Sequence, residues 1–108
     1  MKEDCEGIAR DVDDGSLASR LDGAYPENEY LEMTFFMSGA GEYRGAEILM
    51  TFGGPTIWID TRKRTVEGRW GSKEVSVPVS PKMVEKLDDY CEQQFRNAIY
   101  QATERGGS

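Results

Sequence analysis

The chain has 108 residues, of which 38% are hydrophobic and 31% are charged, and it contains no histidine. This length allows one domain with a single core, and the composition is that of a folded globular protein rather than a disordered one. No run approaches the roughly 20 apolar residues that a membrane span requires. The acidic start of the chain, residues 1–6, is unlike a signal peptide, so we expect a cytoplasmic protein.

The formal net charge of −7 is confined to the first third of the chain. Residues 1–32 hold ten acidic and three basic side chains, whereas residues 33–108 hold ten of each. A negative field concentrated in this way repels nucleic acid and attracts cationic surfaces. The charge distribution therefore predicts a basic partner and no direct contact with nucleic acid.

Residues 2–14 predict a short amphipathic helix that ends near Gly15, because apolar side chains recur at helical spacing: Cys5, Ile8, Ala9 and Val12. Three carboxylates crowd the carboxyl end of this helix, where the helix dipole disfavours them: Asp11, Asp13 and Asp14. That misfit is either incidental or a sign that these carboxylates serve something other than helix stability. Ser16–Glu29 is expected to be an ordered connection, in which Leu17 and Leu21 add a further helical turn.

Five short runs in residues 30–79 alternate apolar and polar side chains, which is the pattern of strands that bury one face. The runs are Tyr30–Met37, Ala46–Phe52, Thr56–Asp60, Thr65–Trp70 and Glu74–Val79. We expect successive runs to pair antiparallel. The register that gathers the apolar residues on one face pairs Phe35 with Ile48, Met50 with Ile59, Ile59 with Val66, and Trp70 with Val75.

Residues 80–104 predict a long helix. Ser80 is a favoured N-cap, and Pro81 is tolerated in the first turn because its missing N–H would have no partner there. The apolar stripe of the helix is Val84, Leu87, Cys91, Phe95, Ala98 and Ala102. The predicted fold class is therefore α+β, a five-stranded antiparallel meander packed on a long C-terminal helix, with a short N-terminal helix. Residues 1–108 form one domain: an acidic helix and connection (1–29), the sheet (30–79) and the helix (80–104).

The opposite face of the predicted sheet is polar, with Asp60 among its solvated residues, apart from Phe36, Leu49 and Trp58. These three fall diagonally on neighbouring strands, close enough to form one apolar patch, with Arg69 near enough to stack on Trp58. Either the apolar side of the N-terminal helix covers the patch, or the patch is open to a partner. We favour the covered arrangement, in which the acidic side of the helix faces outward.

The sequence offers little for catalysis. The absence of histidine removes an imidazole base and the commoner zinc sites. No Ser or Cys lies in a nucleophile motif such as Gly-x-Ser-x-Gly, and the two cysteines, Cys5 and Cys91, are expected to be reduced thiols on helix faces. The carboxylate pairs Asp13-Asp14 and Asp88-Asp89 lie in acidic stretches that do not separate their pKa values. We expect neither an enzyme nor a cofactor or metal site.

Four segments of the middle of the chain carry a resemblance: EMTFFMSG (32–39), EYRGAE (42–47), GGPTIWIDT (53–61) and VEGRW (66–70). They resemble a group of small uncharacterised proteins carried by phages and conjugative elements of bacteria, in which no catalytic residue is known. In size, acidity and helix–meander–helix plan, the chain is also similar to anti-CRISPR proteins. Several of those block a Cas effector by occupying its nucleic-acid site with carboxylates. This second likeness is one of class, and it implies action in the cytoplasm of a host bacterial cell.

Our leading interpretation is a non-enzymatic, phage- or element-encoded inhibitor that binds a basic nucleic-acid-binding surface of a host defence protein, such as a Cas effector complex. Five N-terminal carboxylates would stand in for backbone phosphates: Asp11, Asp13, Asp14, Glu27 and Glu29. Apolar contacts would come from the sheet, at Phe36, Leu49 and Trp58.

Two other interpretations stay open. One is a protein–protein adaptor or immunity-type module that binds through the Phe36–Leu49–Trp58 face, with the acidity serving only solubility. The other is nucleic-acid binding through the basic turn Arg62-Lys63-Arg64. The sequence identifies neither the partner nor the oligomeric state.

Overall fold

The computed structural model describes the backbone of residues 1–106 and the side chains of residues 1–101. In chain order the elements are α1 (Lys2–Asp13), α2 (Ser16–Leu21), the 3-10 turn η1 (Pro26–Asn28), β1 (Glu32–Met37), β2 (Tyr43–Thr51), β3 (Thr56–Asp60), β4 (Thr65–Trp70), β5 (Lys73–Pro78) and α3 (Pro81–Gly106). The strands form one antiparallel sheet in the order β1-β2-β3-β4-β5. The predicted α+β fold class and the predicted order of elements are confirmed.

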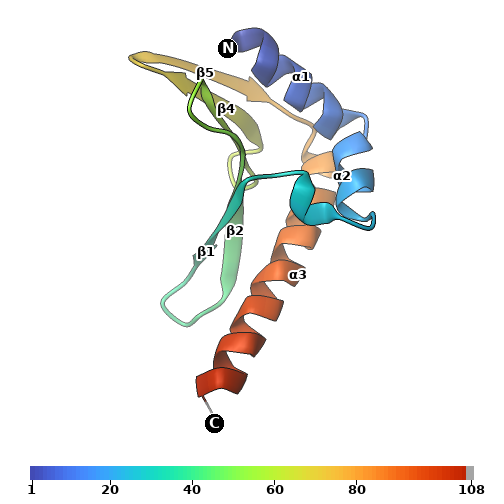
Figure 1. Ribbon diagram of the computed structural model, residues 1–108, viewed down its shortest axis with the longest axis vertical. Coiled ribbons are helices and arrows are strands. Elements are labelled where there is room, and N and C mark those ends of the chain that lie inside the picture. The colour runs from blue at the N-terminus through green and yellow to red at the C-terminus, as the bar shows by residue number, and fades with distance from the viewer. Residues whose placement is uncertain (107–108) are drawn as a thin grey trace.

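The α-helices all lie on one side of the sheet (Figure 1). α3 packs against β1 and β2, whereas α1 packs against β4 and β5. The twist of the sheet turns its two end hairpins in different directions, so one straight helix covers only part of the surface and two helices share it. The prediction that α1 covers the opposite face is therefore wrong. None of the described helices combines the length and the apolar composition needed to cross a bilayer.

The hydrophobic core lies between this inner face of the sheet and the helices. From the sheet, Ile48, Ile59 and Val66 are at most 1% exposed, which confirms that they share one face. The helices contribute a second set of buried side chains: Cys5, Ala9 and Val12 of α1, Leu17 and Leu21 of α2, and Val84, Leu87 and Cys91 of α3. Burial of this apolar surface from both sides is the main source of folding free energy.

The strand register differs from the predicted register at three of the four hairpins. The predicted pairing of Ile59 with Val66 is confirmed, but Ile48 lies opposite both Met33 and Ile59, and Val75 lies opposite Gly68. Each error is a shift of two residues, which changes the neighbours but keeps every side chain on its face. Turn length decides the difference: the Gly71-Ser72 turn sets Trp70 opposite Lys73.

Gly68 lets α1 lie directly on β4. A Cβ atom at this position would be 2.5 Å from the Cys5 Sγ and 3.2 Å from the Met1 Cγ. Real side chains do not approach so closely, so only glycine allows the helix this near to the strand. The close approach places α1 on the inner face, beside α3.

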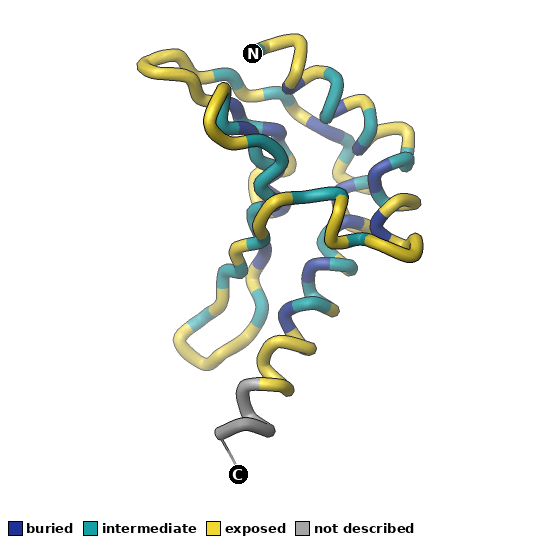
Figure 2. The backbone as a smooth tube through the Cα atoms, in the orientation of Figure 1, coloured by how far each residue is buried: buried dark blue, intermediate teal, exposed yellow. Residues whose placement is uncertain are grey.

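α3 begins at the predicted position, where the Ser80 carbonyl accepts hydrogen bonds from the Met83 and Val84 N–H groups. Its predicted buried stripe holds as far as Phe95 and then leaves the core, because α3 runs on past the β1–β2 hairpin (Figures 1 and 2). Ile99 is accordingly 47% exposed. Ala102, the last predicted stripe residue, falls outside the described side chains.

Candidate functional site

The outer face of the sheet, the side away from α1 and α3, carries the most distinctive surface of the molecule. Strand alternation assigns to it Glu32, Thr34, Phe36, Glu47, Leu49, Thr56, Trp58, Asp60, Thr65, Glu67, Arg69, Glu74 and Ser76. Both long helices pack against the other face, and no described element covers this one. Of the two arrangements that the sequence left open, the open face is the one observed.

A shallow groove lies near the centre of the outer face. Leu49 and Trp58 are directly opposite each other on β2 and β3, and both are half-buried. The groove, which we call the Trp58 groove, has a volume of about 240 Å³ and is lined by Glu32, Thr34, Glu47, Leu49, Thr56 and Trp58. It combines the apolar side chains of Leu49 and Trp58 with two carboxylates, Glu32 opposite Leu49 and Glu47 opposite Thr34.

Phe36 does not belong to the same patch. It lies opposite Gly45, whereas Glu32, four residues earlier on β1, lies opposite Leu49. Four residues of a strand span about 13 Å, so the predicted three-residue patch is divided. The Arg62 guanidinium lies 3.5 Å from the centre of the Phe36 ring and covers it. Gly45 makes this possible, because a Cβ there would collide with the stem of Arg62.

Asp60 is 2% exposed, although the alternation pattern predicted a solvated residue. Its Oδ1 accepts hydrogen bonds from the backbone N–H groups of Arg62 and Lys63, at 2.9 and 3.0 Å. The Arg62 Nε lies 3.8 Å from the same oxygen. The β3–β4 turn therefore folds back on Asp60 and buries it, an effect of turn geometry that strand alternation does not contain.

Arg69 forms a second cluster of an arginine, an aromatic ring and a carboxylate on the outer face. Its guanidinium lies 5.8 Å from the centre of the Trp58 ring and 3.1 Å from a Glu74 oxygen. The predicted proximity of Arg69 to Trp58 is confirmed. The outer face thus holds two of the chain's own arginines by the same combination of ring and carboxylate.

The basic turn does not present three parallel cations. Arg62 is engaged with Phe36 and Asp60, and Arg64 has a left-handed backbone with φ of 58°. The Arg64 carbonyl accepts a hydrogen bond from the Val79 N–H at 3.1 Å. Through these contacts the β3–β4 turn is bound to the sheet and to the segment that leads into α3.

Two of the predicted N-terminal carboxylates are joined by Arg20. This side chain lies 3.3 Å from an Asp11 oxygen and 3.2 Å from a Glu29 oxygen. The guanidinium thereby links α1, α2 and the connection that leads into β1. Both ion pairs are partly exposed, so each contributes little to stability.

Two more of the predicted carboxylates hold backbone N–H groups. The Asp13 Oδ1 accepts a hydrogen bond of 2.7 Å from the Ser80 N–H, next to the start of α3. The Asp14 Oδ1 accepts one of 2.8 Å from the Ser16 N–H, at the start of α2. Hydrogen bonds from the hydroxyl and the backbone of Ser16 lower the pKa of Asp14. The acids at the end of α1 therefore supply hydrogen-bond acceptors to backbone N–H groups at the starts of the neighbouring helices.

The five carboxylates predicted as phosphate mimics are thus not a free array. Asp11, Asp13, Asp14 and Glu29 each hold an internal contact, and Glu27 lies exposed on η1. Their charge persists, because Arg20 supplies a single positive charge against Asp11 and Glu29. The N-terminal region keeps its negative field, and Asp13, Asp14 and Glu27 remain exposed to solvent.

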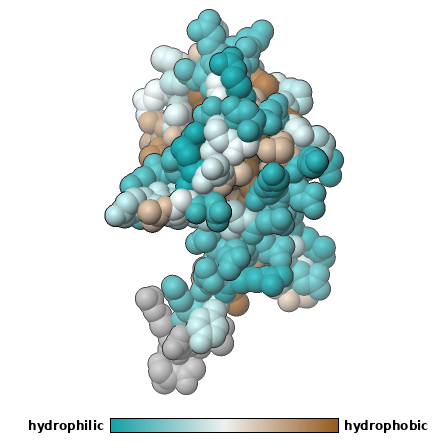
Figure 3. Space-filling view, turned by 90° about the vertical axis from the view of Figure 1, so that its right-hand side faces the viewer, coloured by the Kyte–Doolittle hydropathy of each residue, from teal (hydrophilic) through white to brown (hydrophobic). Residues whose placement is uncertain are grey.

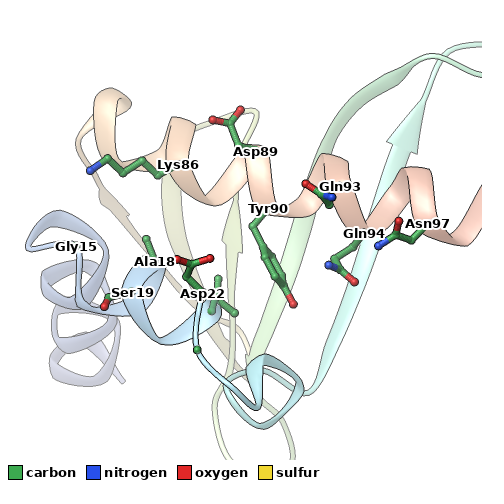
Figure 4. A pocket seen from close by; sticks show the side chains of 12 residues that line it. Gly15, Ala18, Ser19, Asp22, Lys86, Asp89, Tyr90, Gln93, Gln94 and Asn97 are labelled. Atoms are coloured by element: carbon green, nitrogen blue, oxygen red, sulfur yellow. The ribbon is translucent and has the colours of Figure 1, made fainter.

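A groove of about 760 Å³ lies between α2 and α3 and was not predicted from the sequence (Figure 4). Its rim is polar: Ser19, Asp22, Lys86, Asp89, Gln93, Gln94 and Asn97. In Figure 4, Lys86 and Asp89 extend from α3 in different directions, and Tyr90 points toward the segment that follows α2. These groups do not converge on one point, which a site for chemistry requires. Among the described residues, no three metal-ligating side chains gather around a common position.

Burial keeps the thiols protonated. Cys5 and Cys91 are both buried and unpaired, as predicted. Burial raises the pKa of Cys91 to about 12, and it also raises the pKa of Cys5. Burial, with a hydrogen bond of 2.6 Å from the Tyr43 hydroxyl to Asp88, raises the pKa of Tyr43. A thiol held in this state is a poor nucleophile at neutral pH.

Searches against protein-family models, curated proteins and solved structures find no match to this chain. The side of the molecule that bears the helices is covered largely by hydrophilic side chains (Figure 3). The outer face differs, because half-buried Leu49 and Trp58 lie among carboxylates there.

Proposed function

We propose that the protein is a non-enzymatic inhibitor that binds a basic, nucleic-acid-binding surface of a host defence protein, such as a Cas effector complex. The contact surface is the outer face of the sheet. One observation carries the proposal: this face is left bare by both long helices and presents Leu49 and Trp58 beside the carboxylates of Glu32 and Glu47. An apolar centre with a charged rim is the usual composition of a protein-binding surface.

The N-terminal carboxylates supply the long-range field in this proposal, rather than the contact. The whole net charge of −7 resides in residues 1–32. Such a field accelerates encounter with a cationic surface, and its effect falls as salt is added. Contacts on the outer face then determine how long the complex lasts.

The test is inhibition and binding against a panel of purified Cas effector complexes and other nucleic-acid-binding defence nucleases. Against a partner that is inhibited, Trp58→Ser should accelerate dissociation by about tenfold or more, as expected for a central aromatic contact. Changing Asp11, Asp13, Asp14, Glu27 and Glu29 to their amides should mainly slow association and flatten its salt dependence. Surface plasmon resonance at two salt concentrations separates these effects.

The proposal fails if no effector in the panel is bound, or if Trp58→Ser leaves both inhibition and dissociation unchanged. If amide substitution of the five acids abolishes binding while Trp58→Ser has no effect, the contact lies at the N-terminus and the outer face is not the binding surface.

The adaptor or immunity-type interpretation uses the same face, and the apolar pairing of Leu49 with Trp58 favours it equally. The two functions differ in what happens to nucleic acid. An inhibitor competes with labelled DNA or RNA for the partner, so bound nucleic acid is released as the protein is added. An adaptor forms a complex in which nucleic acid stays bound.

A further inference from the structure

We infer that the Trp58 groove takes one arginine side chain presented by the basic surface of the partner. This inference rests on the proposed function, because it names the partner group that the outer face recognises. It assigns the two carboxylates of the groove, Glu32 and Glu47, to the guanidinium, and Leu49 and Trp58 to the methylene stem.

The charge of the groove is uncompensated. Among the described side chains, none forms an ion pair with Glu32 or Glu47. Of the other carboxylates of the outer face, Asp60 has Arg62 and Glu74 has Arg69, whereas Glu67, opposite Trp58, accepts a hydrogen bond only from the neutral Thr65 hydroxyl, at 3.0 Å. The part of the face around Trp58 therefore carries negative charge that is complementary to an incoming cation.

The two resident arginines show which ligand chemistry the face suits. Arg62 lies over the Phe36 ring beside Asp60, and Arg69 lies near the Trp58 ring beside Glu74. The groove adjoins the second cluster and shares its Trp58 ring, while its own carboxylates, Glu32 and Glu47, have no cation partner among the described side chains. It therefore offers carboxylates beside a ring that already lies near one arginine.

Arginine fits the groove better than lysine for a geometric reason. A guanidinium is planar, donates along two edges and stacks on rings, so it can contact both carboxylates while its stem crosses Leu49 and Trp58. An ammonium is a compact, strongly hydrated charge that gains less from a ring and cannot span two carboxylates in this way. The groove volume of about 240 Å³ is sufficient for one such side chain.

The experiment uses the full-length, isotope-labelled chain and three capped tripeptides, Gly-X-Gly, in which X is arginine, lysine or citrulline. Amide and indole N–H signals are followed by NMR during each titration. The arginine peptide should shift the Trp58 indole and the Thr34 amide saturably, and the Trp70 indole, at the β4–β5 turn, should stay fixed. The lysine peptide should bind several-fold more weakly, and the neutral citrulline peptide should give no saturable shift.

The variant Glu47→Gln keeps the shape of the side chain and removes its charge. It should weaken the binding of the arginine peptide by about tenfold, the factor expected for the loss of one charge-assisted hydrogen bond. Glu85→Gln, an equivalent change at an exposed position of α3, should bind as the parent does. Thermal unfolding of both variants verifies that they are folded.

Equal responses to arginine and citrulline, or shifts spread over the acids of α1, would overturn the inference. Equal responses to arginine and lysine would overturn the assignment to a guanidinium. The inference and the proposed function fail separately. If the arginine peptide binds specifically but no defence protein is inhibited, only the proposed function is refuted. If inhibition survives Glu47→Gln and the peptide does not bind, only the inference about the groove is refuted.

Discussion

The two faces of the sheet are made of alternate residues of the same strands, yet they meet different demands. On β3, Ile57 and Ile59 are completely buried in the core, whereas Trp58 between them is half-buried on the open face. The inner face is closed by helices and has no room for added atoms at Gly68. The side chains of the outer face are not covered by a further layer of the protein. Their substitution should therefore change the free energy of unfolding only slightly.

The largest expected effect is the loss of a core side chain. Ile59→Ala removes buried methyl groups and leaves a cavity, which should lower the free energy of unfolding by about 2–5 kcal/mol. Trp58→Thr, the matched change on the outer face, introduces a β-branched residue that suits a strand and should cost about 1 kcal/mol. Urea unfolding of both variants measures the difference. Equal losses would show that the outer face is also part of the core.

A second test adds an atom where α1 meets the inner face. In Gly68→Ala the new methyl group meets the Cys5 Sγ at 2.5 Å, so the free energy of unfolding should fall by about 1–3 kcal/mol. Gly7→Ala, on α1, meets no atom within 4 Å and should stabilise the helix by roughly 0.5–1 kcal/mol. If Gly68→Ala has no effect on stability, α1 does not rest on β4.

The buried thiol of Cys91 predicts an alkaline limit to the stability of the inner face. Its pKa is raised from 9.0 to about 12, so its contribution is complete below pH 9 and is lost as the pH rises toward 12. The free energy of unfolding should fall by up to about 1.4 kcal/mol for each pH unit in this window. Urea midpoints from pH 8 to 11 measure the slope, and Cys91→Ala should reduce it. An equal slope in the variant would assign the loss to other groups.

The smallest expected effect concerns the hydrogen bond between Asp13 and Ser80. Asp13→Ala leaves the Ser80 N–H without its acceptor and should cost about 1 kcal/mol, the usual value for a capping side chain. Asp13→Asn keeps an acceptor oxygen and removes the charge, so its stability should stay close to that of the parent. If the two variants are equally destabilised, charge rather than the hydrogen bond is responsible.

Local periodicity was sufficient for much of the fold. The two-residue period of the strands assigned Ile48, Ile59 and Val66 to one face, and the helical period found α1 and the buried stripe of α3 as far as Phe95. The register was less accurate, because a shift of two residues leaves the burial pattern intact. The turns that choose between such registers depend on backbone geometry at positions such as Gly45 and Gly71, both with positive φ.

The candidate site was predictable in part. Alternation placed Leu49 and Trp58 on the outer face, but it could not show that Arg62 would cover Phe36 or that Asp60 would be buried by its own turn. The charge count found the acidic N-terminal region, yet the partners of its carboxylates, Arg20 and Ser80, lie 9 and 67 residues away along the chain from Asp11 and Asp13. Such contacts exist only once the helices have packed.

The sequence by itself determined which side chains face inward, where the helices begin and where the charge resides, because these properties depend on neighbours a few residues apart. Tertiary structure alone decided which face of the sheet stays open. Gly68 leaves room for α1 to lie on the inner face, a contact between residues more than sixty positions apart, and the outer face with Trp58 and Glu47 stays uncovered. Distances between remote segments are not encoded in any local period, so only the packed chain reveals them.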